Sequence, residues 1–191
     1  MKASTLLLLV ALAASGRTVS AQMVVQPEAK LDAAQTAVRA SLYQLRDTLL
    51  LVEAASARIA RDLRSASDPA LRSRARVMVN RCQAAILQTD STRSVVARGA
   101  LPEPDPKGVR GALDRALGEL RGQLQQCTIQ FTELSAPAKA EELRGYGIGR
   151  GQRVQDAIRK YRPTASQYFR VTFNQQYWPS LSGAGATPSA H

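Results

Sequence analysis

Two cysteines are the side chains of this 191-residue sequence best suited to covalent chemistry. Cys82 and Cys127 stand too far apart for a C-x-x-C redox or metal motif, and an even number of cysteines in an exported chain favours a structural bridge. The one histidine is His191, so four zinc ligands cannot be assembled, and the Cys-x-x-Cys-His motif of a c-type haem is missing. The sequence therefore predicts a Cys82–Cys127 disulfide and no metal or other cofactor.

The acidic side chains form no recognisable catalytic pair. Glu141 and Glu142 are adjacent, so on a helix they would point about 100° apart. Without an internal histidine, general acid–base catalysis would fall to Asp or Glu, and the 15 acids are scattered over polar helix faces. We therefore expect a protein that is not an enzyme; the alternative is an enzyme acting on an anionic substrate.

Alternating glycines from Gly145 to Gly151 make a stretch that is costly inside a helix, so a break or hinge is predicted there. The run lacks the G-x-G-x-x-G spacing of a dinucleotide site and the Gly-Lys-Ser/Thr ending of a P-loop. Arg144, Arg150 and Arg153 flank it. With the exposed N–H groups of the run, these arginines form a candidate anion-binding nest.

Aromatic residues are concentrated late in the chain, with seven of the nine at or after Tyr146. Some have helical spacing and some alternate as in a strand, so periodicity does not decide between the two. Beside arginine and amide side chains they resemble in composition a platform for bases or sugar rings; the alternative is that they close the end of a bundle. The candidate partner-binding residues are Tyr168, Phe169, Arg170, Phe173, Tyr177 and Trp178.

Arginines also crowd into the stretch between residues 58 and 81. This cluster is either a docking patch for an anionic partner or a solvated helical surface that is partly paired with Asp62 and Asp68. Its members are Arg58, Arg61, Arg64, Arg72, Arg74, Arg76 and Arg81.

Apolar residues spaced three and four apart predict the long amphipathic helices that position these side chains. The expected helices cover 27–66, 69–98, 106–134 and 135–162, with Asp68 and Asp105 as caps and Pro163 stopping the last helix. Both cysteines fall on apolar faces. The predicted fold is all-α, an elongated antiparallel bundle of about four helices at 22–162 with coiled-coil-like seams, followed by an aromatic segment at 163–178 and a disordered tail at 179–191.

The first 21 residues have the character of a cleaved secretory signal peptide. Lys2 precedes an apolar run from Leu6 to Ala14 that is too short to span a membrane, and small residues lead to a cleavage site after Ala21. The alternative is an uncleaved anchor. No later stretch is long and apolar enough to be a membrane span, so we expect a periplasmic or secreted protein.

The sequence carries a formal net charge of +11, with 21 arginines against 5 lysines. A genome rich in G and C produces this bias without selection for binding, and no nucleic-acid-binding motif is present, so we expect no specific nucleic acid. The expected partner is an unknown protein or an anionic envelope polymer, and oligomerisation is left open. We expect an exported, non-enzymatic helical-bundle protein that binds or scaffolds an extracytoplasmic partner; a holdase-like periplasmic chaperone is a further alternative.

Overall fold

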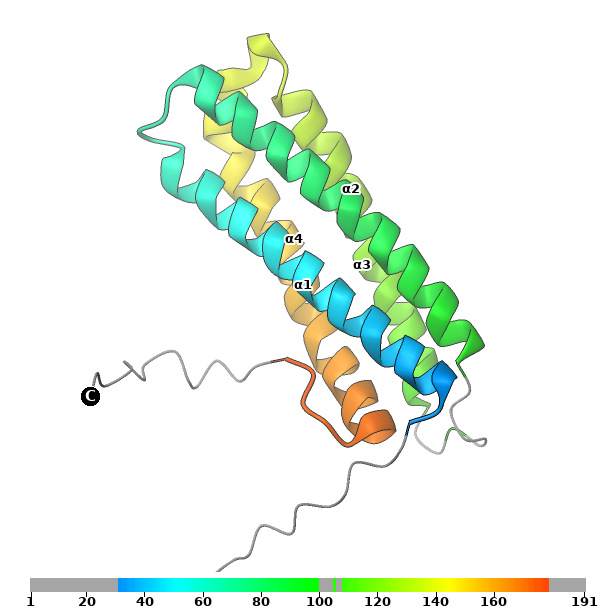
Figure 1. Cartoon of the computed structure of the whole chain (residues 1–191). Coiled ribbons are helices and arrows are strands. Elements are labelled where there is room, and N and C mark those ends of the chain that lie inside the picture. The colour runs from blue at the N-terminus through cyan, green and yellow to red at the C-terminus, as the bar shows by residue number, and fades with distance from the viewer. Residues whose placement is uncertain (1–30, 100–104, 106–107, 179–191) are drawn as a thin grey trace, which may run out of the picture. The chain divides into compact units, whose positions relative to one another are not determined.

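The computed structural model describes residues 31–99, 105 and 108–178, which contain four long helices and no strand (Figure 1). Helix α1 spans Ala33–Asp62, α2 spans Asp68–Arg98, α3 spans Val109–Leu134 and α4 spans Ala140–Phe173, with a 3-10 turn at Pro137–Lys139. The predicted signal peptide at 1–21, the start of the first predicted helix and the predicted disordered tail at 179–191 lie outside the described residues. None of the described helices combines the length and the apolar character needed to cross a membrane.

Each helix packs against the next one, and α4 also packs against α1, so the four helices surround one core (Figure 1). Neighbouring helices are antiparallel, as two contacts between α1 and α2 illustrate. Near the start of α1, the Ser41 hydroxyl lies 2.9 Å from the hydroxyl of Thr92 near the end of α2, whereas Asp62 at the end of α1 pairs with Arg74 near the start of α2. The predicted all-α antiparallel bundle is therefore confirmed.

The core consists of the apolar seams that the three-and-four spacing predicts. On α1 the apolar side chains of the seam are at most 2% exposed, and Ser41 and Ser56 are its buried polar members. Ser41, Ser56, Thr89 and Thr92 are the buried polar side chains among the described residues. The buried seam of α1 contains Val38, Leu42, Leu45, Leu49, Val52 and Ile59.

Aspartate side chains cap the first turns of α1 and α3. The Asp32 carboxylate accepts a hydrogen bond from the backbone N–H of Gln35 at 2.7 Å, and the Gln35 side chain accepts one from the N–H of Asp32. The Asp105 carboxylate accepts hydrogen bonds from the N–H groups of Val109 and Arg110, so Asp105 is a cap although α3 begins at Val109. At α2 the cap position is Ser67, one residue before the predicted one.

Helix α4 continues through the glycine run, so the predicted break or hinge between Gly145 and Gly151 is wrong. Gly147 and Gly151 are buried one helical turn apart and face α1. A Cβ on Gly151 would overlap the Oγ of Ser56, and one on Gly147 would lie 3.5 Å from the side chain of Leu63. Gly151 therefore lets α4 approach α1 closely, and this packing outweighs its poor helix propensity.

Pro163 lies inside α4, so the predicted end of the fourth helix before this residue is also wrong. Proline removes one helical hydrogen bond, to the carbonyl of Arg159 four residues earlier. Both residues are exposed, so water can solvate that carbonyl, while the neighbouring Tyr161 and Ala165 anchor the helix in the core. Residues 163–173 are thus part of the bundle.

Candidate functional site

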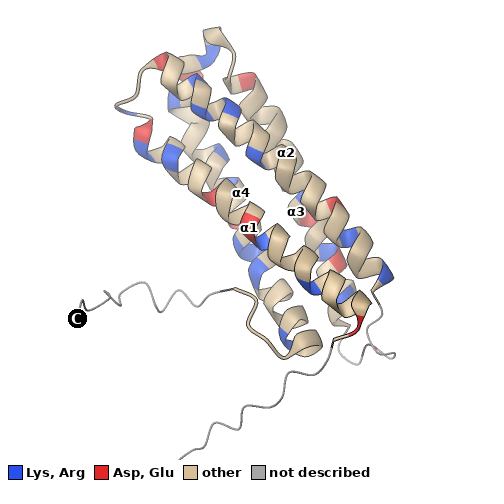
Figure 2. Ribbon diagram, viewed as in Figure 1, with Lys and Arg blue, Asp and Glu red and all other residues tan. Residues whose placement is uncertain are grey.

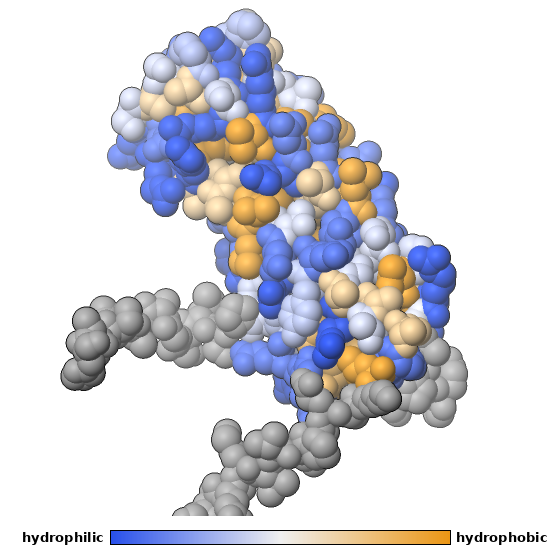
Figure 3. All heavy atoms as spheres, viewed as in Figure 1, coloured by the Kyte–Doolittle hydropathy of each residue, from blue (hydrophilic) through white to orange (hydrophobic). Residues whose placement is uncertain are grey.

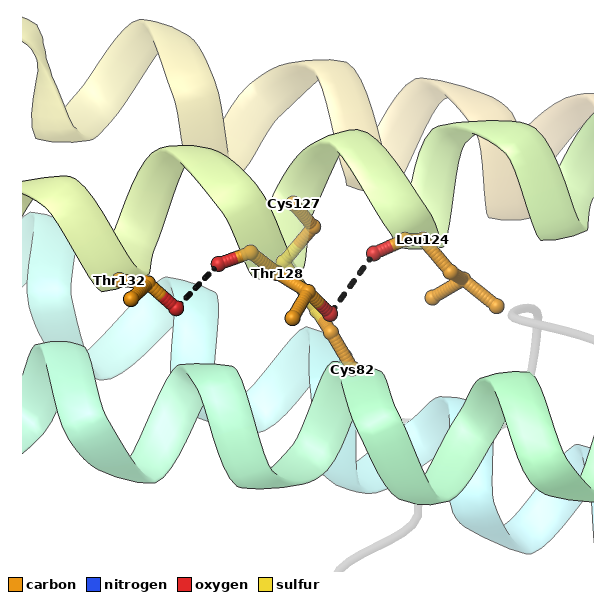
Figure 4. Close-up of a disulfide and its surroundings, with 5 residues drawn as sticks. All are labelled: Cys82, Leu124, Cys127, Thr128 and Thr132. Atoms are coloured by element: carbon orange, nitrogen blue, oxygen red, sulfur yellow. Dashed lines mark hydrogen bonds between the residues drawn. A yellow bond between two sulfur atoms is a disulfide. The ribbon is translucent and has the colours of Figure 1, made fainter.

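The disulfide between Cys82 and Cys127 links α2 to α3 in the bundle interior (Figure 4). The two residues are 0% and 2% exposed, and their Cα atoms lie 6.4 Å apart. The predicted pairing is confirmed, and the chain has no other cysteine. Since neither sulfur is open to solvent, this bridge is suited to holding two helices together rather than to thiol exchange.

The three arginines that flank the glycine run do not converge on an anion nest. Arg144 donates hydrogen bonds to the carbonyls of Leu63 and Ala66, at 2.6 and 2.9 Å, and pairs with Asp68. Arg153 instead lies on the side of α4 that faces α3, and Arg150 is half-buried. The N–H groups of the run belong to a continuous helix, so the loop geometry that a nest requires is absent.

Of the arginine cluster between residues 58 and 81, Arg74 and Arg58 pair with Asp62. Asp68, the other predicted acidic partner, binds Arg144 of α4. Figure 2 shows basic residues around the turn between α1 and α2 and also along α4, so positive charge is not confined to one end of the bundle. The cluster alone therefore does not define a site.

Five of the late aromatic residues close one end of the core. Tyr168, Phe169, Phe173, Tyr177 and Trp178 are each at most 8% exposed, whereas Arg170 is exposed. The Phe169 ring centre lies 4.8 to 5.0 Å from those of Tyr43, Phe173 and Tyr177. Their burial agrees with the core-closing alternative and not with a surface platform, and the segment up to Phe173 is helical rather than extended.

Residues 174–178, which we name the C-terminal strap, turn back over α1 and α4 (Figure 1). Asn174 ends α4 in the left-handed conformation, with φ of 52°. The Tyr177 hydroxyl donates to the carbonyl of Leu42 at 2.7 Å, and the Arg162 guanidinium lies 4.5 Å from the Trp178 ring centre. Arg162 also pairs with Glu53 of α1, so the strap lies on an ion pair that joins α1 to α4.

A groove of about 840 Å³ lies between α3 and α4. We call it the α3–α4 groove. Small side chains on both walls leave this space open, namely Ala112 and Ala116 from α3 and Ala157 from α4. Its polar lining residues are Arg115, Glu119, Gln123, Arg153, Asp156, Lys160 and Thr164.

The charge of the α3–α4 groove is positive. Arg115, Arg153 and Lys160 make no ion pair with another described residue, whereas Asp156 pairs with Arg159 at 2.9 Å. Glu119 is the remaining acid, so three cations from two helices face one unneutralised carboxylate. Sequence reasoning identified Arg153 but missed Arg115 and Lys160, because their approach depends on the register between α3 and α4.

The fold and this surface define a class of protein: a disulfide-linked antiparallel four-helix bundle with a basic groove between its last two helices. No family model, curated protein or solved structure matches the chain.

Proposed function

We propose that this chain is an exported binding protein that holds an anionic envelope polymer in the α3–α4 groove. The observation that carries the proposal is that Arg115, Arg153 and Lys160, from two helices, line one groove whose walls also carry alanines. Charge-assisted hydrogen bonds from such side chains to sulfate, phosphate or carboxylate groups are stronger than neutral ones.

The shape of the groove favours an extended ligand. Arg153 and Lys160 are two helical turns apart on α4, which separates them by about 10 Å along the axis. Arg115 stands on the facing wall, and Gln123 and Thr164 add neutral hydrogen-bonding groups. A polymer with repeated negative charges can contact these cations in succession, whereas a single small anion would reach fewer of them.

Export is part of the proposal. It is supported by the signal-like residues 1–21 and by a disulfide in the core, which is typical of proteins from oxidising compartments. Expression in cells followed by fractionation and N-terminal analysis tests this part: we expect an extracytoplasmic product that begins at Gln22.

Binding is tested with labelled dextran sulfate as the anionic probe and uncharged dextran as its control. We expect residues 22–191 to bind the sulfated probe alone, with affinity that falls as salt is raised. Arg115→Gln with Arg153→Gln should weaken binding by about tenfold or more. The matched control, Arg61→Gln with Arg76→Gln, removes the same charge from α1 and α2 and should bind like the parent; equal loss in both variants would refute a specific groove.

The enzymatic alternative would place Glu119 or Asp156 in a catalytic role, because both line the same groove. Glu119→Gln distinguishes the two functions. A binding protein should retain or improve its affinity for the anionic probe when this carboxylate is neutralised. An enzyme would instead lose turnover of its substrate while still binding it.

A further inference from the structure

The side of the bundle formed by α1 and α2 lies opposite the α3–α4 groove, because the helices pack in the order α1, α2, α3, α4 around the core. Two contacts give the register of α1 and α2. The Gln88 side chain donates to that of Gln44 at 3.4 Å, and Asp62 pairs with Arg74. Leu51, between Gln44 and Asp62, therefore lies across from Arg81.

Large apolar side chains are exposed on this side. Leu51 and Val77 are each 46% exposed, and Leu87, farther along the outer side of α2, is 73% exposed. Ala55, Arg58 and Val77 line one shallow hollow between the two helices. In Figure 3, viewed as in Figure 1, hydrophobic residues alternate with hydrophilic ones over this side. We name Leu51, Ala55, Arg58, Val77, Arg81, Ala84 and Leu87 the α1–α2 face.

The charged residues of the α1–α2 face are basic. Arg58 and Arg81 lie beside the apolar side chains Leu51, Ala55 and Val77. Of the nearby acids on α1, Asp47, one turn before Leu51, pairs with Arg46, and Asp62 is shared by Arg58 and Arg74. Two copies of this face would bring arginines against arginines, so its charge disfavours pairing with a second chain. An anionic surface complements it instead.

We propose that the α1–α2 face docks the protein on a bilayer that contains anionic phospholipids. The free energy of membrane binding becomes more favourable when leucine and valine side chains enter the headgroup region, and when arginines contact anionic lipids. Leu51, Ala55 and Val77 lie beside Arg58 and Arg81 on one side of the bundle, so both kinds of contact form in one orientation. The α3–α4 groove then faces away from the bilayer and stays open, so this inference is independent of the proposed ligand.

The test is co-sedimentation of residues 22–191 with vesicles. We expect binding to vesicles of phosphatidylglycerol mixed with phosphatidylcholine, and none to phosphatidylcholine alone. Arg58→Gln with Arg81→Gln should weaken binding by about fivefold per arginine. Leu51→Ser with Val77→Ser should weaken it by about tenfold. Far-UV circular dichroism establishes that each variant is folded.

Two controls distinguish this face from other surfaces. Ile129 on α3 is 45% exposed, so Ile129→Ser removes a comparably exposed apolar side chain and should leave vesicle binding unchanged. Arg115→Gln with Arg153→Gln should also leave it unchanged. Failure to bind anionic vesicles, or equal losses in the face and control variants, overturns the proposal. A fall in solution molar mass on Leu51→Ser with Val77→Ser, with vesicle binding intact, would show instead that the face joins two copies of the chain.

Discussion

The hydroxyl of Tyr177 donates a hydrogen bond to the backbone carbonyl of Leu42, at 2.7 Å, and thereby ties the C-terminal strap to α1. A tyrosine hydroxyl has one hydrogen, so the second contact of this group, 3.2 Å from the hydroxyl of Tyr161, is a bond that Tyr161 donates. Both rings are 1% exposed. Three elements, α1, α4 and the strap, therefore meet in one buried chain of hydrogen bonds.

Replacing Tyr177 by Phe should destabilise the protein by about 1 to 3 kcal/mol, because the buried Tyr161 hydroxyl loses its acceptor. Urea unfolding monitored by circular dichroism measures this change. Tyr146→Phe is the matched control, since the Tyr146 side chain is 62% exposed, and it should change the free energy of unfolding by less than about 0.5 kcal/mol. Equal effects of the two changes would contradict the role of the buried hydroxyls.

Alkaline pH should unfold the bundle through the same two tyrosines. Burial raises the pKa of Tyr161 and that of Tyr177. A pKa raised in the folded state means that the neutral phenols stabilise the fold fully below the unfolded value of about 10, and that this stabilisation is lost as pH rises toward the folded value. The thermal midpoint should therefore fall above about pH 10, and Tyr161→Phe should make the fall shallower. If the thermal midpoint falls with pH equally steeply in the parent and in Tyr161→Phe, the prediction is contradicted.

Periodicity predicted the features that depend on local spacing. The α1 seam and the apolar positions of Cys82 and Cys127 repeat every three to four residues, and this spacing predicted the bundle; the disulfide was predicted from the even number of cysteines. Periodicity could not decide the form of the aromatic segment. Its burial depends on the reversal at Asn174, which places Tyr177 over α1.

The glycine run and the groove escaped prediction because both are tertiary features. Each glycine costs about 1 kcal/mol of helix propensity, which is a local quantity, while the compensating contact of Gly151 is with Ser56 on another helix. Likewise Arg115 and Lys160 are ordinary exposed residues of their own helices. Only the packing of α3 against α4 brings them to one groove.

The glycines of α4 should respond differently to alanine according to what lies beside them. A Cβ on Gly149 would meet open space, so Gly149→Ala should stabilise the protein by about 1 kcal/mol. A Cβ on Gly151 would overlap the Oγ of Ser56, so Gly151→Ala should be less stable than Gly149→Ala by about 1 to 3 kcal/mol. Ser56→Ala combined with Gly151→Ala should recover most of the difference. Urea unfolding of these three variants tests the expected order of stability. Equal stability of Gly149→Ala and Gly151→Ala would contradict close packing at Gly151.

Loss of the disulfide should weaken the bundle without changing its fold. The bridge joins residues separated by 45 positions, and replacing both Cys82 and Cys127 by alanine should lower the free energy of unfolding by about 2 to 4 kcal/mol. Circular dichroism should still show the helical spectrum, because the apolar seams remain. Because both residues are buried, dithiothreitol should reduce the bridge much faster in urea than in native buffer. Rapid reduction of the folded protein would contradict that burial.

The C-terminal strap should stabilise the bundle far more than the residues that follow it. A chain that ends at Phe173 loses Tyr177, which stacks 5.0 Å from Phe169, and Trp178, which lies under the guanidinium of Arg162. Truncation of a buried aromatic side chain costs about 3 to 5 kcal/mol, so this deletion should lower the free energy of unfolding by at least about 3 kcal/mol. A chain that ends at Trp178 keeps every contact described for the strap and is the matched control.

Deletion from residue 163 onward would be a poor test of the strap, because it also removes Tyr168 and Phe169 from the core of α4. The Trp178→Ala variant tests the strap more directly than that deletion does. Arg162 would keep its ion pair with Glu53 but lose the ring beneath it, so we expect a loss of about 3 kcal/mol, less than that of the chain ending at Phe173. Urea unfolding ranks the stability of the chain ending at Phe173, the chain ending at Trp178 and the Trp178→Ala variant. If the chains ending at Phe173 and at Trp178 unfold at the same urea concentration, the strap does not hold α4 against α1.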